Sequence, residues 1–452
     1  IFGAGESGIG AALLAVRQGF EPWVTDAGEI REDRAKSLKE AGIQFESGGH
    51  DLARALKLAE NGGTVIKSPG IPETAPIMMQ LREAGASVIS EIEFASGFAQ
   101  PHGQRIIAIT GANGKTTTTA LIAALFEGAG ADVACVGNIG KSWSRDLAER
   151  SRPAAVQVVE VSSFQLDDIH KFKPEVAVIT NITPDHLDRY ENDFSKYIAS
   201  KLRIVENQTS NQFLVFNSED PVLIEALNQL NTPVSKISFG FQQPTHEGTF
   251  VSNDQIIIQL EKADMMIQTN QFQLKGRHNL LNAMAAVSVA RLLEVSKDSI
   301  RESLTSFMGV PHRLEHFLKI HNVNYINDSK ATTPHAAAAA LGGFDSIVLL
   351  AGGKNKGLAF DNMLAHIDRI THVVAIGDAA TDIESAFAGR APVTIATSMH
   401  EAISQAAKAA SPGDVVLLSP ACASFDWYRS YAHRGQDFAR IVRARLTQGT
   451  PS

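Results

Sequence analysis

The chain has 452 residues, of which 44% are hydrophobic and 20% are charged, so it resembles an ordinary globular protein with room for about three domains. The net charge is -8, without a basic or acidic block, which disfavours nucleic-acid binding. No apolar run approaches the roughly 18 residues that cross a bilayer. The two cysteines, Cys135 and Cys422, do not suggest a disulfide framework. We therefore expect a cytoplasmic protein that binds neither membrane nor nucleic acid.

The first region alternates apolar runs with glycine and proline. Residues 1–8, IFGAGESG, predict the end of a strand and a glycine turn. A helix follows and ends near Gly19, and the next strand ends near Asp26. A further strand is expected over GTVIKS at 63–68, and the first domain should span 1–95.

The middle region, 96–309, repeats an apolar strand followed by a polar loop, as at 105–110 and 155–160. The alternation in DQIIIQL at 254–260 predicts a strand at the edge of a sheet. Helical spacing of apolar residues over 276–295 predicts a long helix.

The last region, 310–452, has the same rhythm, with polar or small residues after INDSK, LLAGG, AIG and LLSPA. Ligands of parallel sheets bind at the carboxyl ends of the strands, so these loops should line one edge. The expected fold class is α/β in three domains. The first and last are Rossmann-like, and the central one is P-loop ATPase-like with a mostly parallel sheet.

The first glycine turn matches G-x-G-x-x-G through Gly3, Gly5 and Gly8, with Asp26 following 18 residues after Gly8. Such glycines let a pyrophosphate approach the backbone at a helix N-terminus. A dinucleotide cofactor is the usual ligand, and a nicotinamide-dependent oxidoreductase is therefore one hypothesis. A tight turn without a ligand is the alternative.

A second glycine turn, TGANGKT at 110–116, also lies between a strand and a helix. Lys115 would contact the β- and γ-phosphates of a nucleotide, and the Thr116 hydroxyl would ligate Mg²⁺. Ile109 stands where a strict P-loop has its first glycine, so this loop is shorter. A ligase that activates a nucleotide-linked substrate with ATP needs both turns, whereas a dehydrogenase or a simple ATPase needs one.

Three further side chains could complete a magnesium site. Glu160 ends an apolar strand, as a Walker-B acid does, although an exposed loop acid would look the same. His186 follows another apolar strand and is either a ligand or structural. Lys201 shares a helical face with Tyr197, so it either extends to water or is buried and neutral. A neutral amine can react with CO₂ to give an anionic carbamate.

These residues resemble the Mur ligase family over nearly the whole chain. The resemblance rests on segments in this order: TGANGKTTT, EVSSFQL, NITPDHLDRY, SKLRI, GRHNLLNA, PHRLE, NDSKATTP and LLSPACASFDWY. The segments GAGESG and SPACASFD are similar to the member that adds D-glutamate to UDP-N-acetylmuramoyl-L-alanine.

The resemblance implies an ATP-dependent amide ligase of peptidoglycan precursor synthesis that forms an acyl phosphate and uses two Mg²⁺ ions. Residues 1–95 would bind the UDP-sugar, 96–309 ATP, and 310–452 the amino acid. A monomer with only small-molecule partners is expected. The alternatives are another Mur-family or folylpolyglutamate-type ligase, or a nucleotide-binding module without catalysis.

The resemblance also implies roles for individual residues. The catalytic set would be Lys115, Glu160, His186, Lys201 and Lys330. ATP would contact Gly111, Asn113, Gly114, Lys115, Thr116, Thr117, Asn279, Arg313 and Asp328. Magnesium would be held by Thr116, Glu160, His186 and carbamylated Lys201. The UDP-sugar and D-glutamate would contact Gly5, Glu6, Ser7, Asp26, Ser68, Asn138, Ser162, Lys330, Thr332, Lys356, Ser424, Phe425 and Tyr431.

Four features depart from the family pattern. Ala112 stands where the family often has threonine, at a site where backbone contacts dominate. Lys354 competes with Lys356 in GGKNKG, and Tyr431 stands where phenylalanine is common. The segment TDAG, which ends at Gly28, lacks the basic residue that some relatives place near the uracil.

Overall fold

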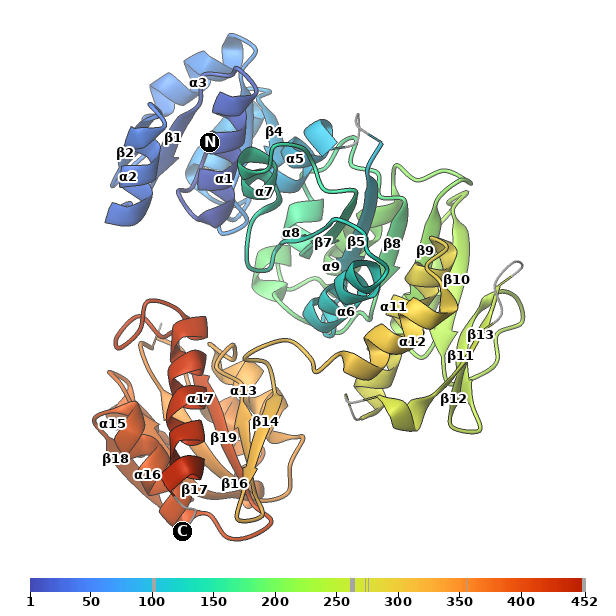
Figure 1. Cartoon of the computed structure of the whole chain (residues 1–452). Helices are drawn as coiled ribbons and strands as arrows, with labels where there is room; N and C mark the ends of the chain where they lie inside the picture. The colour runs from blue at the N-terminus through green and yellow to red at the C-terminus, as the bar shows by residue number, and fades with distance from the viewer. Residues whose placement is uncertain (100–102, 261–264, 273, 275, 356, 449–452) are drawn as a thin grey trace. The chain divides into compact units, whose positions relative to one another are not determined.

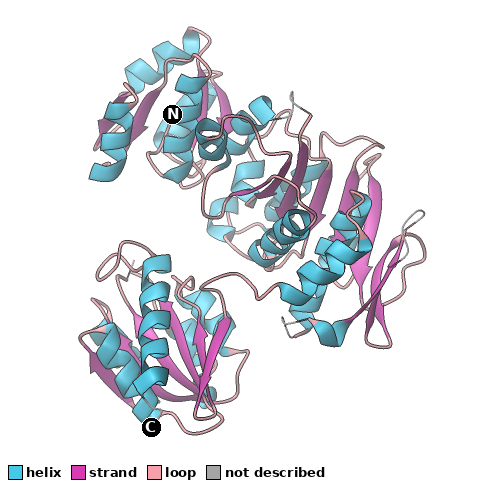
Figure 2. Cartoon of the chain, in the orientation of Figure 1, coloured by secondary structure: helices cyan, strands magenta, loops and turns pink. Residues whose placement is uncertain are grey.

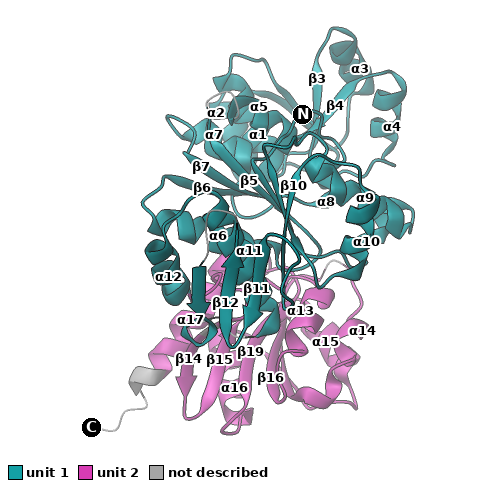
Figure 3. Cartoon of the chain, turned by 90° about the vertical axis from the view of Figure 1, so that its right-hand side faces the viewer, with its two compact units in different colours: residues 1–307 teal, residues 308–452 magenta. Residues whose placement is uncertain are grey.

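The structure is a computed structural model that describes residues 1–99, 103–260, 265–272, 274, 276–355 and 357–448. The chain forms two compact units, Ile1–Phe307 and Met308–Ser452 (Figure 3). The predicted boundary near residue 95 lies inside one helix of the first unit, so the bounds of three domains stay a prediction. Among the described residues, no helix is both long enough and apolar enough to cross a membrane.

The first part of unit 1 is a small parallel sheet flanked by helices (Figure 1). Its elements are α1 (Glu6–Arg17), β1 (Trp23–Asp26), α2 (Glu32–Glu40), β2 (Gln44–Ser47), α3 (Leu52–Glu60), β3 (Thr64–Lys67), α4 (Pro76–Glu83), β4 (Ser87–Ser90) and α5 (Glu91–Ala99). Phe2 bridges β1 and β3 by parallel pairing with Thr25 and Lys67. The glycine turn after Phe2 therefore lies at the carboxyl end of this sheet.

The second part of unit 1 is built on a nine-stranded sheet in the order β13-β12-β11-β10-β9-β8-β5-β7-β6, parallel from β11 to β6. Its strands are β5 (Arg105–Thr110), β6 (Val133–Gly137), β7 (Val156–Glu160), β8 (Val176–Ile179), β9 (Phe213–Asn217), β10 (Ser235–Gly240), β11 (Gly248–Ser252), β12 (Gln255–Gln259) and β13 (Met265–Gln268). Its helices are α6 (Lys115–Gly128), α7 (Trp143–Glu149), α8 (Ser163–Leu166), α9 (Phe194–Leu202), α10 (Pro221–Gln229), α11 (Arg277–Leu292) and α12 (Lys297–Ser306). Short 3₁₀ turns are η2 (Leu187–Tyr190), η3 (Arg203–Val205) and η4 (Thr269–Gln271).

The prediction that DQIIIQL forms an edge strand is wrong in its position. The segment forms β12, which pairs antiparallel with β11 on one side and β13 on the other. Its side chains alternate between buried and half-buried. The alternation of apolar and polar residues indicates that one face of the strand is partly exposed. It does not indicate an edge strand, because an interior strand of a sheet can also have one partly exposed face.

The large sheet is covered by helices on both faces. Along β5, Ile107 and Ile109 join a core with α6, α11 and α12, whereas Ile106 and Ala108 join a core with α5, α7, α9 and α10. Because successive side chains of a strand point to opposite faces, a continuous apolar run is what a strand buried on both faces requires.

Unit 2 contains a six-stranded sheet between helices (Figure 2), in the order β14-β15-β19-β16-β17-β18. Its elements are β14 (Glu315–Ile320), β15 (Val323–Asn327), α13 (Pro334–Leu341), β16 (Ile347–Gly352), α14 (Asp361–Leu364), η5 (Ile367–Arg369), β17 (Ile370–Ile376), α15 (Ala380–Phe387), β18 (Val393–Ala396), α16 (Met399–Ala409), β19 (Val415–Ala421) and α17 (Tyr431–Gln448). Strands β15, β19, β16 and β17 are parallel neighbours. The loops that follow them share one edge of the sheet, as the sequence predicts.

Candidate active site

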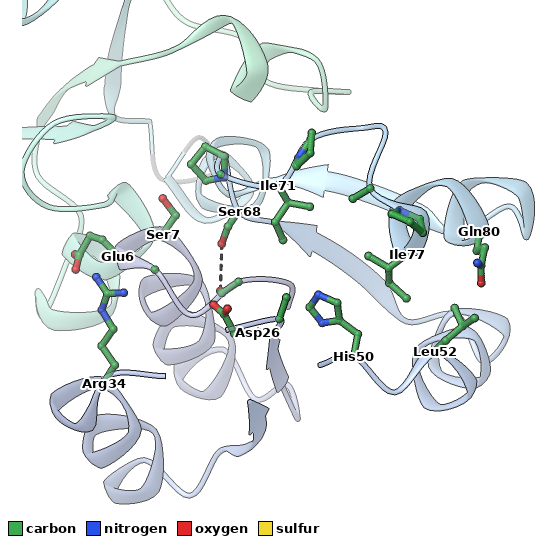
Figure 4. Close-up of a pocket in the computed structure, with 18 residues that line it drawn as sticks. Glu6, Ser7, Asp26, Arg34, His50, Leu52, Ser68, Ile71, Ile77 and Gln80 are labelled. Carbon is green, nitrogen blue, oxygen red and sulfur yellow. Dashed lines mark hydrogen bonds between the residues drawn. The ribbon is translucent and has the colours of Figure 1, made fainter. Parts of the chain in front are cut away.

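A cavity of about 960 Å³ lies beside the first glycine turn (Figure 4). The backbone requires glycine at two of its positions. Gly3 has φ +89°, and a Cβ there would lie 2.7 Å from Ser68. A Cβ on Gly8 would lie 1.8 Å from the Gly3 carbonyl oxygen. Gly5 has open space beside it, so a ligand could approach the backbone at this residue.

Five predicted substrate residues line this cavity: Gly5, Glu6, Ser7, Asp26 and Ser68. The Asp26 carboxylate accepts hydrogen bonds from the backbone N–H groups of Ala4 (2.6 Å) and Gly28 (2.9 Å). The Ser68 hydroxyl donates to the Gly3 carbonyl at 3.1 Å. These bonds hold the shape of the turn, so Asp26 and Ser68 also organise the cavity.

One charge pair and one cation stand at the end of this cavity near α1. Glu6 pairs with Arg145 at 2.9 Å. Arg34, which the sequence analysis did not single out, reaches from α2 and donates to the Ala4 carbonyl at 3.0 Å. Figure 4 shows its guanidinium directed toward Glu6. No sequence pattern predicts this position, because α2 approaches the glycine turn only through tertiary packing.

The second glycine turn joins β5 to α6, and two of its glycines have positive φ. Gly111 has φ +147° and Gly114 has φ +83°. The backbone N–H of Asn113 donates to the Asn181 side chain at 2.8 Å, which fixes the middle of the turn. The Lys115 ammonium donates to the carbonyls of Gly111 and Ala112, each at 2.8 Å. Lys115 is therefore folded over the turn, where phosphate oxygens would replace these carbonyls as its acceptors.

Thr116 and Glu160 meet beneath this turn. The Thr116 hydroxyl donates to Glu160 Oε2 at 2.7 Å, and both side chains are buried. Glu160 reaches this point because β7 pairs with β5, in register with Ile109. Two oxygen-bearing side chains thus lie together at the second glycine turn, and oxygen atoms are the ligands that a hard cation such as Mg²⁺ prefers. Thr117 follows on α6 and is half-buried.

Lys201 does not extend to water, since it is 2% exposed. Its ammonium donates to the Gly111 carbonyl at 2.9 Å and lies 4.6 Å from the centre of the Tyr197 ring. Burial, followed by repulsion from Lys115, holds the pKa of Lys201 well below its usual range. Lys201 and Lys115 thus share the Gly111 carbonyl as an acceptor at the second glycine turn.

His186 is placed differently from the other predicted metal ligands. Its side chain is 56% exposed, its backbone has φ +50°, and its Nε2 lies 3.6 Å from Asp185. The ring packs edge-on against Phe164, with centroids 6.0 Å apart. Asp185, which the sequence analysis did not single out, also acts electrostatically on Lys201. The sequence could have indicated Asp185, because in the segment PDH it directly precedes the candidate ligand His186.

Three other predicted residues of unit 1 surround the same turn or the strands beside it. Asn138 is exposed after β6, and its N–H donates to the Glu160 carbonyl at 2.8 Å. Ser162 is buried and caps α8 in a capping box with Gln165. Asn279 lies in the first turn of α11 and accepts from Asn282, whose amide packs against Gly114.

In unit 2, most of the predicted residues lie on the loops that follow β15 and β19 and at the start of α17, whereas Arg313 lies just before β14. Asp328 is buried, and it accepts from the Ser419 hydroxyl at 2.8 Å and from the Leu314 N–H at 3.2 Å. Burial raises the pKa of Asp328 to about 6. Lys330 and Thr332 follow Asp328 within four residues, and these two side chains and that of Arg313 are half-buried.

The second loop of unit 2 contains a buried and an exposed candidate. Ser424 is buried, whereas Phe425 is 56% exposed. Tyr431 begins α17, and its carbonyl accepts from Ser329 at 2.8 Å. Lys356 lies outside the described residues. In the part of the chain that the structure describes, no three His, Cys, Asp or Glu side chains are grouped so that they could hold a metal ion.

The fold and these two glycine turns are typical of a nucleotide-binding α/β protein. Comparison with known proteins identifies its family. The family model for the Mur ligase middle domain matches residues 109–290, and that for the Mur ligase, glutamate ligase domain matches residues 312–422. The chain belongs to the Mur ligase family.

Similar proteins cover nearly the whole chain. The UDP-N-acetylmuramoylalanine–D-glutamate ligase of Christiangramia forsetii is 42% identical over 446 residues, covering 98% of each chain. The enzymes of the same name from Salinibacter ruber and Bacteroides fragilis are 40% and 39% identical, covering 97% and 98% of those chains and at least 98% of this one.

Among solved structures, UDP-N-acetylmuramate-alanine ligase from Thermotoga maritima aligns with a TM-score of 0.58 at 19% identity, over 98% of both chains. A pseudomurein peptide ligase type C from Methanothermus fervidus aligns with a TM-score of 0.55 at 18% identity, over 99% of both chains. These likenesses support the expected α/β fold class.

Proposed function

We propose that this protein joins D-glutamate to UDP-N-acetylmuramoyl-L-alanine with cleavage of ATP to ADP and phosphate. The structural observation that supports this most strongly is that unit 1 contains two glycine turns of the kind that binds phosphate. One lies beside a cavity of about 960 Å³, and the other is surrounded by Lys115, Thr116, Glu160 and Lys201. The choice of D-glutamate rests on the names of relatives that align over nearly the whole chain.

The acidic and hydroxyl side chains at the second turn fit a divalent cation. Thr116 and Glu160 would hold one Mg²⁺, and His186 with carbamylated Lys201 would hold a second. Bound Mg²⁺ would screen the negative charge of the phosphates and of the substrate carboxylate. Lys201 suits carbamate formation because its amine is buried and directed at the phosphate turn.

The chain's own residues would hold the reactants in place. In the first step, an oxygen of the alanyl carboxylate attacks the γ-phosphorus of ATP, and the bond to ADP breaks. In the second, the D-glutamate amine attacks the acyl carbon, the phosphate leaves with its bonding electrons, and the amine loses a proton. Lys115 would bind the β- and γ-phosphates, exchanging its carbonyl partners for phosphate oxygens. Gly111, Asn113, Gly114 and Thr117 would contribute the rest of the phosphate cradle.

Unit 2 would supply further contacts to ATP and to the acceptor amino acid. We propose that Arg313 and Asp328 contact ATP, and that Asn279 of unit 1 contacts it as well. Lys330, Thr332, Lys356, Ser424, Phe425 and Tyr431 are assigned to D-glutamate or its acyl partner. Cationic side chains are suited to this role because D-glutamate has two carboxylates. We further propose that the enzyme acts as a monomer in the cytoplasm, and size-exclusion chromatography tests the first part.

Phosphate release with a panel of acceptors tests the proposed function. D-Glutamate should stimulate release only when UDP-N-acetylmuramoyl-L-alanine is also present. Stimulation by another amino acid, or by a folate substrate, would favour a different amide ligase. Tight binding of NAD(P)H in a fluorescence titration would favour the oxidoreductase. ATP binding without turnover for any acceptor would favour the non-catalytic module.

A further inference from the structure

Arg189 links the wall of the cavity to the loop that contains His186. It lies in η2, three residues after His186, and is half-buried. Its Nη1 donates to the Pro69 carbonyl at 2.6 Å, and its Nη2 donates to the Gly70 carbonyl at 3.1 Å. Pro69 and Gly70 both line the cavity beside the first glycine turn. One guanidinium therefore binds a wall of the cavity from a loop about 120 residues further along the chain.

The same side chain is packed against the neighbourhood of His186. The guanidinium carbon lies 4.4 Å from the centre of the Phe164 ring, and the Phe164 ring meets the His186 ring edge-on. The backbone N–H of Arg189 also donates to the His186 carbonyl at 3.1 Å. Any shift of the cavity wall relative to the His186 loop must therefore break hydrogen bonds or this stacking.

We propose that Arg189 is a positioning residue. It sets the distance between the cavity beside the first glycine turn, where the nucleotide of the substrate would bind, and the region of His186 and Lys201, where phosphate would be transferred. This inference rests on the proposed function. The substrate is one covalent molecule, with its uridine diphosphate in the cavity and its reacting carboxylate near His186 and Lys201. If the two sites drift apart, the nucleotide still binds, but the carboxylate no longer lies in line with the phosphate. A displacement of about 1 Å can lower the rate by about 10²-fold.

Arginine is suited to this role because its planar guanidinium presents two parallel donors and can stack on an aromatic ring at the same time. Lysine could keep one of these hydrogen bonds, but it could not make both of them while it stacks on the Phe164 ring. Arg189 is not the sole contact that holds the segment around Pro69 and Gly70 to the second part of unit 1. Lys67, two residues before Pro69, is buried and forms an ion pair with Asp168 at 2.7 Å. Loss of Arg189 should therefore loosen the spacing without unfolding the unit.

The test compares Arg189→Met with a matched control, Arg17→Met. Arg17 also joins the first part of unit 1 to the second through backbone carbonyls, donating to Leu147 (2.8 Å) and Ala148 (3.0 Å). It contacts neither the cavity nor the His186 loop in the described structure. Calorimetric titration gives the affinity of UDP and of UDP-N-acetylmuramoyl-L-alanine for each variant, and phosphate release gives kcat and KM.

For Arg189→Met we expect UDP affinity within about twofold of the parent, with kcat lower by about 10- to 100-fold. The additional affinity of the full substrate over UDP should fall as well, because it depends on both ends binding together. Arg189→Lys should be intermediate, and Arg17→Met should leave kcat unchanged.

Three results would overturn the inference: an unchanged kcat in Arg189→Met, an equal fall in the affinities of UDP and full substrate, or the same loss in Arg17→Met. Inactivity of the parent protein with D-glutamate would refute the proposed function instead. In that case the two affinities still test the positioning role.

Discussion

Replacing Lys201 with alanine should abolish most activity while leaving the fold in place. The side chain is 2% exposed, and its amine lies 2.9 Å from the Gly111 carbonyl at the phosphate turn. Removal of a group that stabilises charge at a reaction centre typically lowers kcat by about 10²–10³-fold, or about 3–4 kcal/mol. The Gly111 carbonyl keeps a partner, because Lys115 also donates to it at 2.8 Å. The fold loses packing, which typically costs about 2–5 kcal/mol, but it is also relieved of a buried amine.

The assay is phosphate release, with the unfolding temperature measured in parallel. Bicarbonate should not restore activity to Lys201→Ala, whereas a short carboxylate such as acetate should restore part of it by supplying the missing anionic oxygen. Lys196→Ala is the matched control on the same helix, because Lys196 is 46% exposed and pairs with Glu191 at the surface. Normal turnover of Lys201→Ala would refute the carbamate role.

Three further predictions concern the cavity and two buried acids. Gly3→Ala should weaken UDP binding and destabilise the fold by about 1–3 kcal/mol, because φ is +89° and the new Cβ would lie 2.7 Å from Ser68. Gly5→Ala should keep the unfolding temperature of the parent, because a Cβ there meets no other atom. A loss of stability in Gly5→Ala equal to that in Gly3→Ala would contradict the steric argument. Burial raises the pKa of Glu91 from 4.5 to about 7, so the folded state binds the proton more tightly than the unfolded chain does. Stability should then fall as pH rises from about 4.5 through 7, by on the order of 3 kcal/mol, and Glu91→Gln should lack this fall in urea unfolding. Since burial raises the pKa of Asp328 to about 6, the KM for ATP should increase as pH drops below about 6; a KM that is constant from pH 5 to 8 would count against its assigned contact with ATP.

Local chemistry made parts of the site predictable. The phosphate turn could be found because Gly114, Lys115 and Thr116 are adjacent and lie between a strand and a helix. Glu160 could be found because it ends a wholly buried strand. In both cases the signal is contained in about ten residues.

The other features of the site depend on tertiary packing and could not be predicted from local sequence. A lysine on an amphipathic helix can be buried or exposed, and the burial of Lys201 depends on Tyr197 and on the distant Gly111. Arg189 was not predicted because its partners, Pro69 and Gly70, come from another part of the chain. Neither contact leaves a periodic pattern in the sequence.

The central claim is that ATP activates the carboxylate of the UDP-linked substrate. The most direct measurement uses UDP-N-acetylmuramoyl-L-alanine labelled with ¹⁸O in the alanyl carboxylate, followed by mass spectrometry of the phosphate released with D-glutamate. The mechanism predicts that one ¹⁸O atom passes into each phosphate, because the oxygen that attacks the γ-phosphorus leaves with it. Phosphate without ¹⁸O, formed alongside the amide product, would contradict the account.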